Sequence, residues 1–331
     1  MASPIPESWK LLAWNGISLH VPRHWEVSSL ATSYLQLDDG VGPVLELKWQ
    51  RLKGAFSHQA QIKKLARLSK AMSVQSFRQQ PTPERWRDAL EDFEAQAFVW
   101  HGRKTGGEGT ILYCASCRTA TLLQFYRQAS RDDPHIPAQV LGSLRDHSED
   151  GWVAWSLFGL RALMPQRFTL SRHRFQPGHY QLAFQCQQER LSLERWGPAD
   201  IQLKRGDLRQ WFEQSCRDSC WQNFSSLEGY NDNGKPVLCG QQRGSKTIGA
   251  RLWARLSGRL SHIWFRIWHL PAQNQILGVR AEGPRALDES LLGEICSNYE
   301  MVPETECAES SAHRWTKQSV RGAHVLPVKK P

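Results

Sequence analysis

Apolar and polar residues alternate along two stretches of the chain that resemble each other. The first is GISLHVPRHWEVS at 16–28 and the second is GLRALMPQRFTLS at 159–171. Each has a Gly, an alternating segment that ends in an apolar residue and Pro, then an aromatic residue and a second short alternation. A period of two is typical of half-buried strands, so both stretches predict strands in the same arrangement.

The repetition continues beyond these stretches. VLELKW at 44–49 and LSLERW at 191–196 both end in a basic residue and Trp, and each is followed by an amphipathic helical run, at 56–72 and at 207–221. Asp207 is the expected N-cap of the second run. Three predicted strands and a final helix then follow in each copy. In the first copy the strands are at 97–102, 110–116 and 120–128 and the helix is near 136–147. In the second copy the strands are at 251–258, 261–268 and 274–283 and the helix is near 287–299. The same order of elements twice indicates an internal duplication.

Short turns between successive strands predict antiparallel pairing, and helices segregated from the strands predict an α+β fold. We therefore expect two tandem repeats of an antiparallel sheet packed with helices. A length of 331 residues suits two domains. The expected division is an N-terminal segment 1–8, a first repeat 9–150, a second repeat 151–303 and a basic tail 304–331 that is rich in Ser, Lys and Pro and expected to be disordered.

The element order resembles the Mog1/PsbP-like fold, which includes the DcrB-like bacterial proteins. The short motif that carries the resemblance is an apolar residue and Pro just before an aromatic residue, Val21-Pro22 with Trp25 and Met164-Pro165 with Phe168. The resemblance implies a binding or assembly module for other proteins. It implies no shared active site whose residues could be assigned here.

Composition narrows the setting of the protein. The N-terminal stretch lacks a basic region followed by an apolar run, and no stretch approaches the roughly 18 apolar residues of a membrane span, so we expect a cytoplasmic protein with reduced cysteines and no membrane span. The formal net charge is +10. Lys and Arg number 18 against 15 acids in 9–150, and 19 against 13 in 151–303. A positive charge spread so evenly is more typical of a feature that keeps a protein soluble than of a surface that binds a nucleic-acid backbone.

The most suggestive surface is a predicted hairpin at 251–269. Side chains alternate across a strand, so one face would be apolar. The opposite face would carry the candidate binding residues, which are Trp253, Arg255, His262, Trp264, Arg266 and Trp268. Interleaved Trp and Arg could stack bases and neutralise phosphates. The interpretation we favour is that a helix covers this face and buries the Trp side chains, with Arg at its edge.

Cys114 and Cys117 form a CxxC motif at a predicted hairpin turn, where a zinc site could present two thiolates. Zinc needs four ligands, and the spacing reveals no second pair. The second repeat replaces the turn with His269-Leu-Pro271. We therefore expect no metal at these two weak candidates, and no cofactor.

No other segment matches a catalytic motif. GRKTGGEGT at 102–110 lacks the phosphate-loop spacing and NDNGK at 231–235 lacks the distal Glu of a calcium loop, so both predict turns. The function that fits best is a noncatalytic protein-binding or assembly factor whose partner is another protein. The alternatives are nucleic-acid or anionic-ligand binding through the Trp/Arg face, or an enzyme with a site between the domains.

Overall fold

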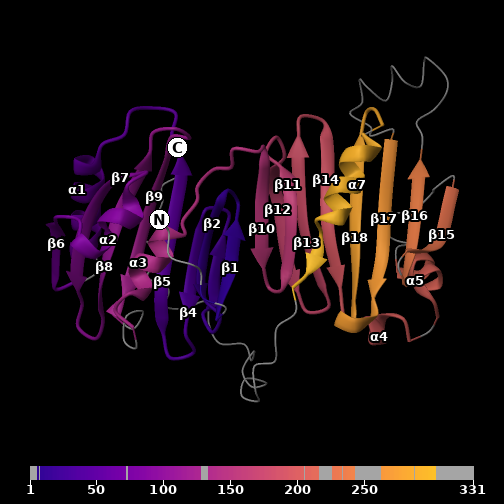
Figure 1. Cartoon of the computed structure of the whole chain (residues 1–331), viewed down its shortest axis with the longest axis horizontal. Coiled ribbons are helices and arrows are strands. Elements are labelled where there is room, and N and C mark those ends of the chain that lie inside the picture. Colours follow the sequence, from indigo (N-terminus) through magenta and orange to yellow (C-terminus); the bar gives the residue numbers. More distant parts are fainter. Residues whose placement is uncertain are drawn as a thin grey trace. The chain divides into compact units, whose positions relative to one another are not determined.

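The computed structural model of the chain describes residue 6 and residues 8–71, 74–127, 133–204, 206–215, 226–232, 234–242, 262–286 and 288–302. It divides into two compact units, one that extends to Ser148 and one that spans Glu149–Pro303. Figure 1 labels the helices and strands of both units along the chain.

The first unit contains a hairpin and a seven-stranded sheet. The hairpin consists of β1 (Trp9–Trp14) and β2 (Ile17–Pro22). The sheet is antiparallel throughout and has the order β3-β4-β5-β9-β8-β7-β6. Its strands are β3 (Glu26–Ala31), β4 (Tyr34–Asp38), β5 (Pro43–Arg51), β6 (Ser76–Gln80), β7 (Glu94–His101), β8 (Gly106–Cys114) and β9 (Thr119–Tyr126).

The second unit repeats this arrangement. Its hairpin consists of β10 (Trp152–Leu157) and β11 (Leu160–Pro165), and the short β19 (Glu300–Met301) pairs with β11. Its seven-stranded antiparallel sheet has the order β12-β13-β14-β18-β17-β16-β15. Its strands are β12 (Thr169–Gln176), β13 (His179–Cys186), β14 (Glu189–Trp196), β15 (Ser226–Asp232), β16 (Lys235–Gln242), β17 (His262–Leu270) and β18 (Gln275–Gly283). The two sheets therefore share one strand order.

Local geometry explains why the sequence repeats itself. Gly16 and Gly159 close the two-residue turns of the opening hairpins, with φ of +89° and +73°, a conformation that glycine adopts without strain. Pro22 accepts a backbone hydrogen bond from Trp25 (3.0 Å), as Pro165 does from Phe168 (2.9 Å). Both aromatic side chains are buried. The repeated motif thus encodes the same hairpin and the same corner in each unit.

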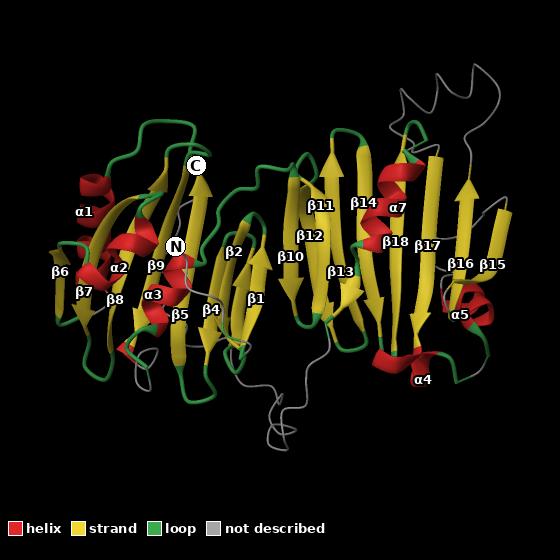
Figure 2. Ribbon diagram, in the orientation of Figure 1, coloured by secondary structure: helices red, strands yellow, loops and turns green. Residues whose placement is uncertain are grey.

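Helices cover parts of the first sheet on both faces. The amphipathic α1 (His58–Ala71) packs Ile62 against Phe98 of β7 and Ile111 of β8. On the opposite face Trp86 of α2 (Glu84–Arg87) contacts Phe125 of β9, with 6.0 Å between ring centroids. The 3-10 helix η1 (Asp88–Leu90) and α3 (Ile136–Gly142) follow, and Figure 2 shows α2 and α3 in front of the strands.

The second sheet is covered in a similar way. The short α4 (Ala199–Gln202) precedes α5 (Leu208–Ser215), whose Trp211 and Phe212 belong to one core cluster with Phe265 and Ile267 of β17. Asp207 caps α5 as expected, because its carboxylate accepts a hydrogen bond from the backbone of Gln210 (2.8 Å). The 3-10 helix η3 (Pro271–Gln273) links β17 to β18, and α7 (Glu289–Ser297) crosses in front of β18 in Figure 1.

The expectation of an α+β fold built on helix-packed sheets is wrong, because antiparallel strands dominate the described residues and the helices are few and short. The opening hairpins supply part of the covering layer that the prediction gave to helices. In the second unit Trp155 of β10 packs against Phe184 of β13, with centroids 4.9 Å apart. None of the described helices is both long and apolar enough to cross a membrane.

Candidate functional site

The predicted Trp/Arg face maps onto one strand in the second unit. His262, Trp264, Arg266 and Trp268 alternate along β17, while Trp253 and Arg255 lie outside the described residues. From Ile263 to Trp268, β17 pairs with β16 on one edge and β18 on the other. The other strand of the predicted hairpin, 251–258, lies outside the described residues.

The two faces of β17 differ as the alternation requires. Phe265 and Ile267 are buried in the cluster that contains α5. On the opposite face Trp268 is only 7% exposed, and its ring meets that of Tyr299, just after α7, edge to face at 5.7 Å. His262, Trp264 and Arg266 are partly buried. The face is therefore part core and part surface.

Arg266 is already engaged by neighbouring side chains. Its guanidinium lies 2.7 Å from the carboxylate of Asp232, and its carbon lies 5.9 Å from the centroid of the Tyr230 ring. Tyr230 stands on β15, the terminal strand of the described sheet, and is 46% exposed. The Tyr230 hydroxyl lies 3.6 Å from the thiol of Cys239. These four side chains form what we call the Tyr230 corner.

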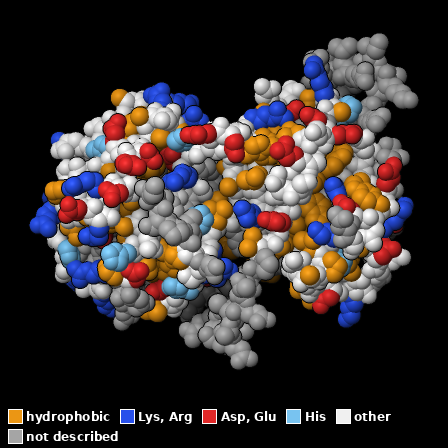
Figure 3. All heavy atoms as spheres, viewed as in Figure 1, with side chains coloured by type: hydrophobic (Ala, Val, Ile, Leu, Met, Phe, Trp, Pro, Cys, Tyr) orange, Lys and Arg blue, Asp and Glu red, His pale blue; other side chains and the backbone are white. Residues whose placement is uncertain are grey.

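Charge is not segregated on the surface. Figure 3 shows Lys and Arg side chains interspersed with Asp and Glu over the visible part of both units. At the Tyr230 corner Asp232 is partly buried, and the neighbouring acid Glu228 is exposed. A surface of this kind has little to attract a phosphate backbone.

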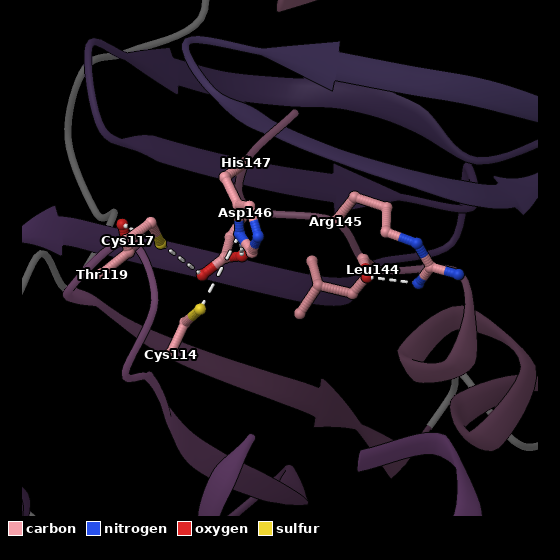
Figure 4. Close-up of polar contacts among 7 residues, drawn as sticks. All are labelled: Cys114, Cys117, Thr119, Leu144, Arg145, Asp146 and His147. Carbon is pink, nitrogen blue, oxygen red and sulfur yellow. Dashed lines mark hydrogen bonds and ion pairs between the residues drawn. The ribbon is translucent and has the colours of Figure 1, made fainter. Parts of the chain in front are cut away.

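A second constellation lies in the first unit, where two distant segments meet (Figure 4). Cys114 ends β8, and Cys117 lies in the turn before β9. Asp146 and His147 follow α3, after Arg145 forms an isolated β-bridge with Ser18 of β2. The ligand atoms of the two cysteines, Asp146 and His147 all lie within 4.8 Å of one another.

The contacts within this group, which we call the Cys-Asp-His cluster, are short. The thiol sulfur of Cys117 lies 3.1 Å from a carboxylate oxygen of Asp146, and that of Cys114 lies 3.7 Å from Nδ1 of His147. The other carboxylate oxygen of Asp146 lies 2.7 Å from the same Nδ1. Burial is the main cause that raises the pKa of Cys117 to about 12. Its sulfur also lies 3.1 Å from the hydroxyl of Thr119.

The expectation of no metal at Cys114 and Cys117 rests on the lack of a second pair of candidate ligands in the sequence spacing. The structure brings such a pair, Asp146 and His147, beside the two cysteines from 29 residues or more along the chain. The helix predicted over 136–147 hid them, because α3 ends at Gly142. The available signal was an Asp-His dipeptide, which is separated from α3 by three residues.

Two further polar clusters surround buried carboxylates on middle strands of the sheets. In the first sheet Glu46 on β5 binds Lys48 (2.7 Å), Tyr126 (3.1 Å) and Gln124. In the second sheet Glu194 on β14 accepts from Gln181 (3.1 Å) and Ser192 (3.2 Å) and lies 2.8 Å from Nε2 of His179.

Neither cluster is arranged for nucleophilic catalysis. In the second one the hydroxyl of Ser192 donates to Glu194, so the carboxylate lies between Ser192 and His179 and the imidazole is not positioned to deprotonate the hydroxyl. Burial and the nearby charge of Glu46 raise the pKa of Tyr126 far above its usual value, so its phenol stays protonated and donates to that carboxylate. These contacts satisfy buried charge and stabilise the sheets.

Comparison with known proteins gives matches only among solved structures. No family model and no curated protein matches the chain. The Saccharomyces cerevisiae Ran-binding protein Mog1p matches at 10% identity and a TM-score of 0.30, over 46% of this chain and 95% of Mog1p. The Pseudomonas aeruginosa T6SS immunity protein TplEi matches at 7% identity and a TM-score of 0.32, over 89% and 98% of the two chains. A structure of the Tle4–Tli4 complex matches at 8% identity and a TM-score of 0.32, over 91% and 99%. A Mog1 protein, named in the fold resemblance drawn from the sequence, is thus among the structures that match.

Proposed function

We propose that the chain is a noncatalytic factor that binds another protein through the Tyr230 corner of its second unit. The observation that carries the proposal is the exposure of Tyr230, 46%, beside an arginine that is already ion-paired. Tyr, Trp and Arg are the residues most enriched where protein interfaces concentrate their binding energy. Trp264 and Arg266 lie on the same face of the sheet, with Trp264 only partly buried.

Charge at the corner favours a protein over a nucleic acid. The ion pair with Asp232 neutralises Arg266, and Glu228 adds an exposed negative charge on the same strand. A phosphate would have to displace the aspartate and approach a second acid. A partner that offers an apolar side chain to the Tyr230 ring and a basic group to Asp232 and Glu228 fits these charges.

The test compares what the full chain retains with what two variants retain. Tagged wild-type protein, Tyr230→Ser and Val41→Ser are captured from cells of the source organism after mild cross-linking. Val41 is the matched control, because it is 75% exposed in the first unit and far from the corner in sequence. We expect a protein that wild type and Val41→Ser both retain and that Tyr230→Ser loses by at least about 10-fold, the loss expected from one central interface residue.

A second measurement tests the alternative that the Trp/Arg face binds nucleic acid. Fluorescence anisotropy with a single-stranded oligonucleotide at low salt should show no binding that depends on Arg266. Binding that falls with salt and is abolished by Arg266→Glu would assign the face to nucleic acid instead. Retention of the same protein by wild type and Tyr230→Ser alike would contradict the proposed surface.

A further inference from the structure

We propose that Cys114, Cys117, Asp146 and His147 bind one zinc ion that ties the β8–β9 turn to the segment after α3. Nothing in the proposed protein-binding role requires this site. The distances between the four side chains suit a zinc ion. With zinc about 2.3 Å from sulfur and about 2.0 Å from nitrogen or oxygen, the edges of a tetrahedral site measure roughly 3.2 to 3.8 Å. The pairs Cys114–His147 at 3.7 Å and Cys117–Asp146 at 3.1 Å already lie near those values.

The buried negative charge of Asp146 also favours a cation at this site. The side chain of Asp146 is only 2% exposed. Among the described residues its sole potential cationic partner is His147, since the neighbouring Arg145 turns away and donates to the backbone oxygens of Gly142 and Leu144. A buried carboxylate needs a compensating charge, and a divalent cation between it and two thiols supplies one.

The chemistry of the ligand set selects the metal. Both cysteines are free thiols, and two thiolates with one imidazole form a soft-to-borderline set that suits Zn²⁺ rather than Ca²⁺ or Mg²⁺. Four protein ligands fill a tetrahedral shell and leave no open position for water or substrate. The site is therefore structural. Each thiol gives up its proton to solvent when the ion binds.

The place of the cluster in the fold agrees with a structural role. The ligands come from segments about 30 residues apart along the chain, so the ion closes a long loop between the β8–β9 turn and the segment after α3. In the second unit the β17–β18 turn contains η3, with Pro271, Ala272 and Gln273, none of which binds zinc. Among the described residues, no comparable group of metal ligands lies at that turn.

Elemental analysis tests the site on the full chain, purified with a reductant and without added metal. We expect about one zinc per chain. The double variant Cys114→Ser/Cys117→Ser should lose it, and Cys186→Ser should keep it. Cys186 is the matched control, because it is a partly buried free cysteine on β13 of the second unit.

A second, more conservative variant tests the site even if the double variant does not fold. Asp146→Asn keeps the shape of the side chain, and in competition with a chelator it should weaken zinc binding by more than the roughly 10-fold that changes around metal ligands typically cost. Cobalt bound in place of zinc should give wild type the intense visible bands of a tetrahedral thiolate site. Three results would overturn the proposal: folded wild type without zinc and with both thiols free, a Cys114–Cys117 disulfide in the native protein, or zinc retained by the double variant.

Discussion

The two units share a backbone plan and differ in the chemistry placed on it. The turn before β9 and the turn before β18 both end in a residue with positive φ, Arg118 at 59° and Asn274 at 52°. The first turn carries Cys117 and directly follows Cys114, and the second carries Pro271 and Gln273. The same strand order therefore tolerates different turn side chains, because the order depends on alternating apolar residues in the strands.

The sheet faces differ in the same way. The fifth residue of β8 is the buried Thr110, and the fifth residue of β17 is the ion-paired Arg266. Both sheets also bend their first hairpin by a β-bulge at a serine, Ser28 and Ser171, whose hydroxyl donates to the facing strand. Backbone devices are thus repeated, while surface chemistry has diverged between the units.

The largest expected effect on stability comes from replacing the tryptophans that are buried against each sheet. Trp86 is fully buried against Phe125 in the first unit, and Trp268 is buried against Tyr299 in the second. Replacing either with Ala should lower the free energy of unfolding by about 3 to 5 kcal/mol. Trp264→Ala should cost less than half of that, because the side chain is only partly buried. Urea denaturation followed by circular dichroism measures all three, and equal costs at Trp264 and Trp268 would show that the whole β17 face is core.

A smaller expected effect is a loss of folding stability at low pH that arises in the second unit. Burial lowers the pKa of His173 on β12 and of His269 on β17, both in the second unit. The unfolded chain, with histidine pKa near 6.5, then binds more protons than the folded one, so stability is lost as pH falls from about 6.5 toward the lower folded values. Urea denaturation at about pH 7.5 and about pH 5.5 measures the loss, which should shrink in His173→Gln and His269→Gln. An unchanged loss in both variants would contradict the assignment.

The repeated hairpin and corner could be predicted from the sequence because their local signals were strong, whereas the predicted share of helices was wrong. The turn glycines, the Pro-to-aromatic corner and the period of α1 each specify their own geometry, and the repeat placed them twice. The strands β15 and β16 could not be predicted in this way. SLEGYND and KPVLCGQQ are rich in Gly, Asn and Asp or begin with Lys-Pro, and their pairing depends on the neighbouring strands more than on intrinsic propensity.

The Cys-Asp-His cluster could only be half predicted. Its CxxC motif is local, but its partners depend on how α3 ends. The hydroxyl of Ser143 accepts from the backbone of His20 (2.8 Å) and donates to Val140 (2.8 Å), and Arg145 then forms a β-bridge with Ser18. These contacts between β2 and the end of α3 place Asp146 and His147 beside the turn. The sequence around residue 146 contains no pattern that predicts these contacts with β2.

Hydrogen exchange of the full chain, with and without a zinc chelator, tests most directly whether the two units share a fold but differ in chemistry. Chelation should lower the protection of amides at 114–119 and 143–147 by at least about 10-fold, because the ion ties these segments together. Amides of the equivalent turn at 270–275 should not change. Equal loss in both turns, or no change at 114–119 in protein shown to have lost its zinc, would contradict this expectation.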